Sequence, residues 1–218
     1  MKFNDLPKKI AVFPLSNAIF FPRTVLPLNI FEERYLQLVN DCIKNQRIFG
    51  MIQPKRNNNI KSKKIGPELY KVGCLGKITG FTETEDKRYI VNLKGISKFK
   101  IIEEVKNEYL FREFKVEYLS AEMENASQEK LKCEFINSEL DINQLKKFLK
   151  KRGFSLNWKK IDNMDFKNIV NALCMIMPIT INEKQTLLET ENIMKRFEIL
   201  KNIIDFDIVD KFKNRTIQ

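Results

Sequence analysis

The sequence predicts an α+β protein, with a small β-barrel and one helix in its first half and an all-α helical bundle in its second half. Two observations predict this class. Short apolar runs separated by Gly, Pro and polar turns extend to residue 120, and such runs are typical of strands. Beyond this point the apolar residues recur at helical spacing. We therefore expect two subdomains, a barrel at residues 1–120 and a bundle at residues 121–218.

The first elements are expected in the order strand, proline loop, strand, helix. Residues 10–13 form an apolar strand, Pro14 and Pro22 bound the loop, and residues 25–31 form a second extended run. Pro27 favours extended backbone in the residue before it. A helix follows, because the next apolar residues recur at the spacing of one buried helical face. These residues are Phe31, Tyr35, Leu38, Val39, Cys42 and Ile43.

The segment from residue 47 to residue 118 predicts the remaining strands. Residues 47–53, RIFGMIQ, form a short apolar run, and apolar and polar residues alternate in four later runs. These runs begin near Val72, Tyr89, Phe99 and Phe114. Gly95 is expected to end the run that begins at Tyr89. About six strands, bent by glycines, favour a closed or nearly closed barrel.

The second half predicts helices with recognisable start signals. Residues 126–152 are rich in Lys and Glu and predict one long helix. Asp165 can cap the next helix, and Thr180 with Glu183 matches a capping box that opens a short one. Thr190 is expected to cap the last helix. The apolar positions of that helix are Ile193, Phe197, Leu200, Ile204 and Ile208.

Residues 13–39, FPLSNAIFFPRTVLPLNIFEERYLQLV, resemble the opening of the Lon protease N-terminal domain family. Members of that family share a PL-x-N…P-x-x-x-LPL-x-(I/V)-FE-x-RY pattern. Two later stretches also look like the family: ELYKVGCLGKITGF with RYIVNLKGISKFKI, and INEKQTLLET with the helix that carries Lys195, Arg196 and Phe197. The resemblance extends over roughly residues 8–206. It implies a PUA-like β-barrel in the first half and a substrate-binding role.

Full-length Lon proteases continue from such a domain into an ATPase module and a Ser-Lys peptidase module. This sequence ends at Gln218 and contains no histidine and no P-loop motif. The lack of histidine excludes Ser-His-Asp and Cys-His catalytic arrangements. We therefore expect a stand-alone, non-catalytic protein without a cofactor. A separate protease is a further expected partner.

Metal binding and membrane insertion are not expected. The four cysteines lie far apart and form no C-x-x-C pair, so they are interpreted as small buried hydrophobic residues. They are Cys42, Cys74, Cys133 and Cys174. No apolar run approaches the length of a transmembrane helix, and the N-terminus lacks the features of a signal peptide. We expect a cytoplasmic location.

The proline loop supplies the candidate contacts for unfolded or partner polypeptides. Three consecutive large apolar residues cannot all point to one side of a strand, so at least one is expected to be exposed or to lie under a neighbouring element. The candidate residues are Ile19, Phe20, Phe21, Pro22, Phe31 and Tyr35. In the alternative interpretation the loop phenylalanines fill the barrel end, and Phe31 and Tyr35 belong to the core.

RNA binding is the alternative function. Residues 1–120 hold 22 Lys and Arg against 13 Asp and Glu, a net +9 of the total +11. Residues 54–64 contribute five cations and no acid, as candidate phosphate contacts: Lys55, Arg56, Lys61, Lys63 and Lys64. PUA-like barrels occur in RNA-modifying proteins, but this segment has no aromatic residues to stack on bases. Lysine that simply fills the surface is the favoured explanation of the charge. Binding of a small molecule is a third hypothesis for the function.

Overall fold

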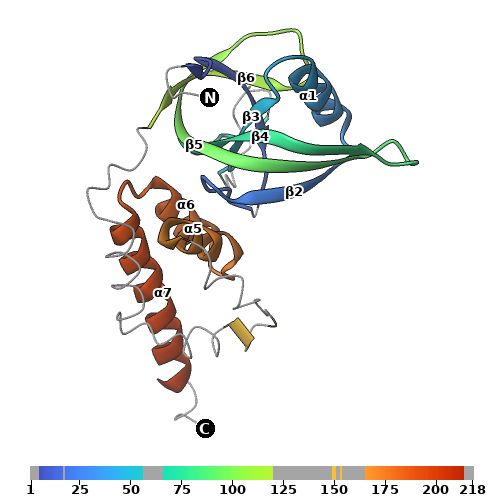
Figure 1. The fold of residues 1–218 in the computed structure, drawn as a ribbon. Helices are drawn as coiled ribbons and strands as arrows, with labels where there is room; N and C mark the ends of the chain where they lie inside the picture. The colour runs from blue at the N-terminus through green and yellow to red at the C-terminus, as the bar shows by residue number, and fades with distance from the viewer. Residues whose placement is uncertain are drawn as a thin grey trace. The chain divides into compact units, whose positions relative to one another are not determined.

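The structure, a computed structural model, describes residues 5–16, 18–55, 66–119, 149–150, 153 and 165–213, with side chains as far as residue 206 (Figure 1). The chain divides into two compact units, Met1–Ala121 and Glu122–Gln218. The described part of the first unit contains six strands and one helix, and that of the second contains three named helices. This content confirms the α+β class.

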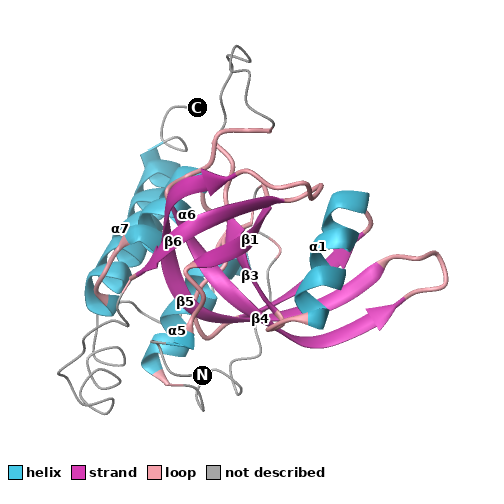
Figure 2. Cartoon of the chain, turned by 90° about the horizontal axis from the view of Figure 1, so that it is seen from above, coloured by secondary structure: helices cyan, strands magenta, loops and turns pink. Residues whose placement is uncertain are grey.

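The six strands form one mixed sheet in the order β2-β5-β4-β3-β1-β6. Figure 2 shows β1, β3, β4, β5 and β6 together with α1. Their bounds are β1 (Lys9–Pro14), β2 (Val25–Ile30), β3 (Ile48–Ile52), β4 (Val72–Glu83), β5 (Tyr89–Val105) and β6 (Arg112–Tyr118). The pair β1–β3 is parallel, and the other pairs are antiparallel. The helix α1 (Glu33–Lys44) connects β2 to β3.

The longest strand, β5, pairs with three neighbours. It pairs with β4 along one edge, while its other edge pairs first with β2 and then with β6. Strand pairing therefore runs from β5 through β4, β3, β1 and β6 and returns to β5. Among the described residues, β2 pairs with β5 alone.

The prediction that Gly95 ends a strand is wrong, because β5 runs through it without a break. The register with β4 shifts here: Leu75 pairs with Ser97, but Gly76 pairs with Gly95. A Cβ atom on Gly95 would lie 2.2 Å from the carbonyl oxygen of Phe21. The glycine therefore permits a close approach of two backbones at a bulge, which is a common role of glycine within a strand.

The first unit has a core inside the sheet and a packed layer under α1. Ten buried apolar residues form the inner cluster: Leu6, Ile10, Val12, Ile48, Ile52, Leu69, Leu75, Phe99, Phe114 and Val116. The buried face of α1 presents Tyr35, Leu38, Val39 and Cys42, as its spacing predicts. Phe13 of β1 stacks on Tyr35 with ring centres 3.9 Å apart, which fixes the start of α1 beside β1.

The prediction that Phe31 lies on the buried face of the helix is wrong. The cap residue of α1 is Glu32, whose backbone is extended, and the helix begins at Glu33. Phe31 therefore lies outside the region where helical periodicity applies, and it is 62% exposed. Because the helix begins two residues later than expected, the Phe31 ring lies at the surface and not in the core.

The second unit contains α5 (Phe166–Ile176), α6 (Ile181–Glu189) and α7 (Ile193–Lys213), which contact one another. Asp165 accepts the backbone N–H of Asn168, and both bonds of the Thr180 capping box are present. The predicted cap of α7 is wrong. Thr190 ends α6, and its hydroxyl donates back to the carbonyl of Thr186, while the Asn192 carboxamide accepts the Met194 N–H at 2.7 Å.

Arg196 of α7 links the described helices α5, α6 and α7 through hydrogen bonds. Its guanidinium is fully buried and donates to the carbonyls of Leu187 and Thr190, both at 2.8 Å. It also donates to Asn171 Oδ1 at 2.6 Å.

The predicted helix at 126–152 falls largely outside the described residues. Within this range only Leu149 and Lys150 are described, and both are helical. The side chain of Ile208 is also outside the described part.

Candidate functional site

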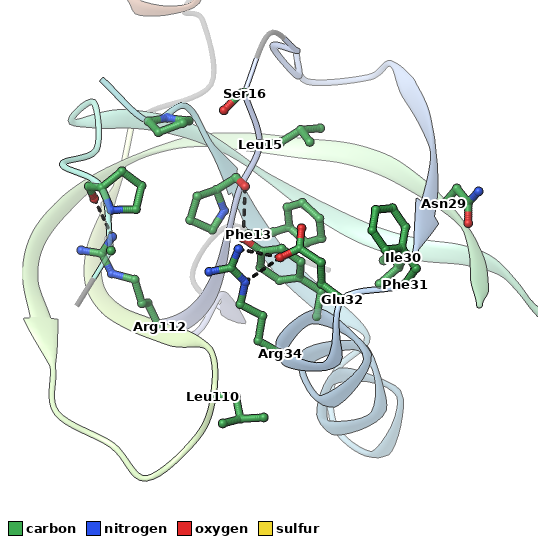
Figure 3. Close-up of a pocket in the computed structure, with 15 residues that line it drawn as sticks. Phe13, Leu15, Ser16, Asn29, Ile30, Phe31, Glu32, Arg34, Leu110 and Arg112 are labelled. Carbon is green, nitrogen blue, oxygen red and sulfur yellow. Dashed lines mark hydrogen bonds and ion pairs between the residues drawn. The ribbon is translucent and has the colours of Figure 1, made fainter. Parts of the chain in front are cut away.

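A cavity of about 420 Å³ opens in the first unit where β1, β2 and α1 meet (Figure 3). We call it the apolar hollow. Residues 13–16, 29–32, 34 and 35 form most of its lining, and residues 54, 66, 67, 110 and 112 complete it. Its volume falls within the range of pockets that hold small molecules or single side chains with part of their backbone.

The floor of the apolar hollow is formed by buried side chains. Phe13, Ile30 and Tyr35 are each at least nine-tenths buried, and the stacked rings of Phe13 and Tyr35 hold one another in place. The Tyr35 hydroxyl donates to the Pro14 carbonyl at 3.4 Å. Burial raises the pKa of Tyr35, although Arg34 opposes this effect. The hydroxyl therefore stays protonated at neutral pH, and the floor is uncharged.

Two large apolar side chains stand exposed at the rim. Phe31 is 62% and Leu110 is 55% exposed, although both line the apolar hollow. The backbone N–H of Leu110 donates to Gln37 Oε1 of α1 at 2.7 Å, which fixes the loop between β5 and β6 over the helix. The Arg88 guanidinium lies 5.6 Å from the centre of the Phe31 ring. Exposed apolar side chains beside a hollow are typical of interaction sites.

The charged groups of the walls occur in pairs. Arg34 donates through Nε and Nη2 to the Glu32 carboxylate, at 2.9 and 2.5 Å. Arg112 donates two hydrogen bonds to Glu104 and a third to the Pro67 carbonyl, at 2.6 to 2.9 Å. Each arginine thus has an acidic partner, so the hollow offers polar anchoring groups without a large net charge.

The six predicted polypeptide contacts fall into two groups. Phe31 and Tyr35 line the apolar hollow. Ile19, Phe20 and Phe21 lie in the core, each at most 3% exposed. As packed here they expose almost no surface, because the loop folds inward against the sheet. The half-buried Pro22 follows them, and none of these four loop residues lines the hollow.

Glycines in the sheet make room for the buried loop. A Cβ atom on Gly76 would lie 2.8 Å from the Phe20 ring, and Gly95 sits directly against the Phe21 backbone. The alternative interpretation, in which these aromatic residues pack inside, agrees with this placement.

Only one of the predicted phosphate contacts lies within the described residues. Lys55 pairs with Glu68 at 2.5 Å, so its charge is partly compensated. Arg56, Lys61, Lys63 and Lys64 lie outside the described part of the chain. Phosphate binding by this segment stays a prediction.

Leu110 was missed, although the sequence contains a signal for it. Residues 109–111 are Tyr-Leu-Phe, a second run of three large apolar residues. Here Phe111 is buried, whereas Tyr109 and Leu110 are exposed. Arg112 and Pro67 carry no such signal, because they reach the hollow only through the pairing of distant strands.

Metal binding and membrane insertion find no support within the described residues. No group of three His, Cys, Asp or Glu side chains there is placed to hold a metal ion. Cys42, Cys74 and Cys174 are buried and form no disulfide, as expected of small hydrophobic residues, while Cys133 lies outside the described part. None of the described helices is both long and apolar enough to cross a membrane.

Comparison with known proteins identifies relatives over nearly the whole chain. The family model described as the ATP-dependent protease La (LON) substrate-binding domain matches residues 9–205. Lon protease 2 of Myxococcus xanthus is 22% identical over 209 residues, which cover 92% of this chain and 24% of that protein. The Lon protease of Orientia tsutsugamushi (strain Ikeda) is 26% identical over 211 residues, 94% of this chain and 26% of the relative. The chain thus spans about a quarter of the length of these curated relatives.

Solved structures share the fold. The Lon N-terminal domain protein from Xanthomonas campestris has a TM-score of 0.62 at 18% identity, covering 89% of this chain and 97% of that one. The N-terminal domain of Mycobacterium avium complex Lon protease has a TM-score of 0.64 at 14% identity, covering 91% and 98%.

Proposed function

Because the chain belongs to the LON substrate-binding domain family, we propose that it is a non-catalytic domain that binds polypeptide in the apolar hollow. One observation carries this proposal. Phe31 and Leu110 stand exposed on the rim of a hollow whose floor is buried aromatic and aliphatic surface. An unfolded polypeptide offers apolar side chains next to backbone hydrogen-bonding groups, and the hollow is complementary to both.

The chemistry of the hollow supports a polypeptide as its occupant. A large apolar side chain that moves from water onto the floor gains about 1.5–3 kcal/mol. The Glu32–Arg34 pair, which is half-exposed, can exchange its mutual hydrogen bonds for bonds to the backbone of the bound chain. Exposed ion pairs contribute only about 0–1 kcal/mol to stability, so this exchange costs little. Weak and sequence-tolerant binding is expected.

We also propose the finer architecture and setting. The circuit of pairing from β5 through β6 and back to β5 supports a PUA-like barrel in residues 1–120. The contacts among α5, α6 and α7 support a helical bundle in residues 121–218. Clients would be unfolded or partner polypeptides in the cytoplasm, passed to a protease on the same chain or on a separate one.

The test removes the two rim side chains. A labelled, neutral peptide of Phe, Leu, Ser and Gly serves as the ligand, and fluorescence anisotropy measures its Kd. The Phe31→Ser/Leu110→Ser variant should bind at least about tenfold more weakly, since each anchor contributes about 1 kcal/mol or more and about 1.4 kcal/mol is a factor of ten. Both positions are exposed, so stability should change by less than about 1 kcal/mol.

A matched control distinguishes this site from general surface hydrophobicity. Val25 and Ile102 are 51% and 59% exposed and lie outside the apolar hollow. The Val25→Ser/Ile102→Ser variant should retain the wild-type Kd. Wild-type affinity in the rim variant, or equal losses in both variants, would contradict the proposed site.

A further inference from the structure

A second cavity, of about 360 Å³, lies at the other end of α1. We call it the acidic hollow. Its lining includes Asp41 and Cys42 from the last turns of α1, Lys9 from β1, Glu113 from β6 and Tyr109 from the preceding loop. The apolar hollow is lined by Arg34 and Tyr35 of the same helix. The two hollows therefore occupy opposite ends of one helix.

One loop contributes to both hollows through consecutive residues. Tyr109 lines the acidic hollow and Leu110 lines the apolar one. The hydrogen bond from the Leu110 N–H to Gln37, at mid-helix, places the junction of the two hollows over the centre of α1. A polypeptide that crosses this loop can place side chains on either side of it.

The distance between the hollows follows from helix geometry. Tyr35 and Cys42 are seven residues apart, which is about 10 Å along an α-helix at about 1.5 Å per residue. An extended segment in the polyproline II conformation advances about 3.1 Å per residue with three residues per turn, so side chains three residues apart lie on the same side of it, about 9 Å apart. Side chains about three residues apart in an extended segment can therefore enter the two hollows together.

The acidic hollow is negative within a strongly basic unit. Glu113 is only 9% exposed and accepts hydrogen bonds from Lys9 Nζ at 3.2 Å and Asn107 Nδ2 at 3.0 Å. Asp41 adds a second carboxylate, so two acids and one lysine line the hollow. Burial raises the pKa of the Cys42 thiol to about 12, and the charges of Asp41 and Glu113 contribute to the rise.

Asp41 lies where a carboxylate does not favour the helix. It is in the last turn of α1, where the helix dipole disfavours negative charge. The helix dipole therefore does not account for a carboxylate at this position. The Lys9 side chain is half-exposed, so an incoming cation can replace it beside Glu113 without disturbing packed atoms.

We infer that the two hollows bind one extended polypeptide segment, with a large apolar side chain in the apolar hollow and a Lys or Arg side chain, about three residues away, in the acidic hollow. The carboxylates supply charge-assisted hydrogen bonds, and the exposed Tyr109 ring supplies a face for the cation. This inference rests on the proposed function and adds to it a preference for charge and spacing.

Three labelled peptides test the inference on the full chain. They share a neutral Ser-Gly background with one Phe, followed three residues later by Lys in the first and by Glu in the second. In the third, Lys directly follows Phe. The first peptide should bind at least about fivefold more tightly than either of the others. The net charge of +11 attracts the Glu peptide from a distance, so a preference for Lys must arise locally.

Paired variants assign the preference to the acidic hollow. Asp41→Asn keeps the shape of the side chain and should reduce the Lys-to-Glu affinity ratio at least about threefold. Glu117→Gln removes one exposed acid of β6 outside both hollows and should leave the ratio unchanged.

Equal binding of the Lys and Glu peptides, or an unchanged ratio in Asp41→Asn, overturns the inference. The Phe31→Ser/Leu110→Ser variant separates this failure from failure of the proposed function. If that variant weakens all three peptides while the wild type shows no charge preference, polypeptide binding stands and the second anchor does not.

Discussion

Two runs of three large apolar residues share the same sequence signal but differ in their placement. Ile19, Phe20 and Phe21 are all buried, whereas in the second run Tyr109 and Leu110 are exposed. In either run, three consecutive side chains cannot all point to the same side of a strand. Their placement depends on what lies opposite, which for the first run is a glycine-lined sheet. Sequence spacing carries no such information, so Tyr35 and Phe31 were found as site candidates and Leu110 was not.

Two weak acids with raised pKa values predict a loss of stability in alkali. Burial raises the pKa of Cys42 and that of Tyr118 to about 12. The unfolded chain releases these protons near their ordinary pKa values of 9.0 and 10.0, so rising pH favours unfolding between pH 9 and 12. The free energy of unfolding should fall by about 2–3 kcal/mol from about pH 8 to about pH 10.5. Urea unfolding at several pH values measures this.

The Cys42→Ala/Tyr118→Phe variant is the control for the alkaline loss. It should show a shallower slope above about pH 9, although it is less stable at about pH 8 because the Tyr118 hydroxyl no longer donates to the Pro7 carbonyl. Lys184, whose pKa is lowered by burial, acts in the opposite direction and remains in both proteins. Equal slopes in the two proteins would show that other groups govern the alkaline transition.

At the scale of elements, local signals predicted the helix caps at Asp165 and Thr180 correctly, whereas the boundaries of other elements were predicted poorly. The Asp165 cap and the Thr180 capping box depend on residues three apart, so the sequence contains all that they require. The start of α1 and the start of α7 were misplaced because apolar spacing and cap residues continue past the true ends. Gly95 was misread because a glycine that ends a strand and one that admits a neighbouring backbone look alike in a sequence.

The edge strand β2 predicts a test of self-association. Among the described residues it pairs with β5 alone, and Pro27 at its centre cannot donate a backbone hydrogen bond. Proline on an edge strand discourages pairing with a second chain. The Pro27→Thr variant restores a donor and a strand-favouring residue, so it should form dimers or larger species at concentrations where the wild type is monomeric. Sedimentation velocity measures the difference.

Asn29→Thr provides the matched control for this edge. It introduces the same residue on the same exposed strand but keeps Pro27. Association in both variants would attribute the effect to β propensity, and association in neither would show that the edge is protected by something other than the proline.

At the scale of the whole molecule, the basic charge is not concentrated in the proposed binding site. Residues 1–120 carry a net charge of +9. The charged groups of the apolar hollow, at one end of α1, are nevertheless balanced, and the hollow at the other end of α1 is acidic. The charge count alone supported an RNA-binding alternative. It could not show that the arginines of the apolar hollow are paired with acids, because strand pairing and turns bring these partners together.

Salt separates polypeptide capture from binding to RNA. Between about 50 and 300 mM NaCl, the Kd for the neutral peptide should change by less than about threefold, since apolar contacts are not screened. Affinity for a labelled RNA oligonucleotide should fall by at least about tenfold, because contacts to phosphate release counterions. Anisotropy titrations with both ligands supply the comparison. RNA binding that is much tighter than peptide binding at low salt, and that weakens steeply with added salt, would favour the alternative function.

The pairing of β1 with β6 has a consequence for the order of synthesis. β1 emerges from the ribosome early, but its antiparallel partner β6 follows more than a hundred residues later, with Lys9 opposite Lys115. At about 5–20 residues per second, one edge of β1 waits roughly 5–20 seconds for its neighbour. A ribosome that stalls before β6 thus holds a nascent chain with an open strand edge, a client of the kind that chaperones and proteases receive.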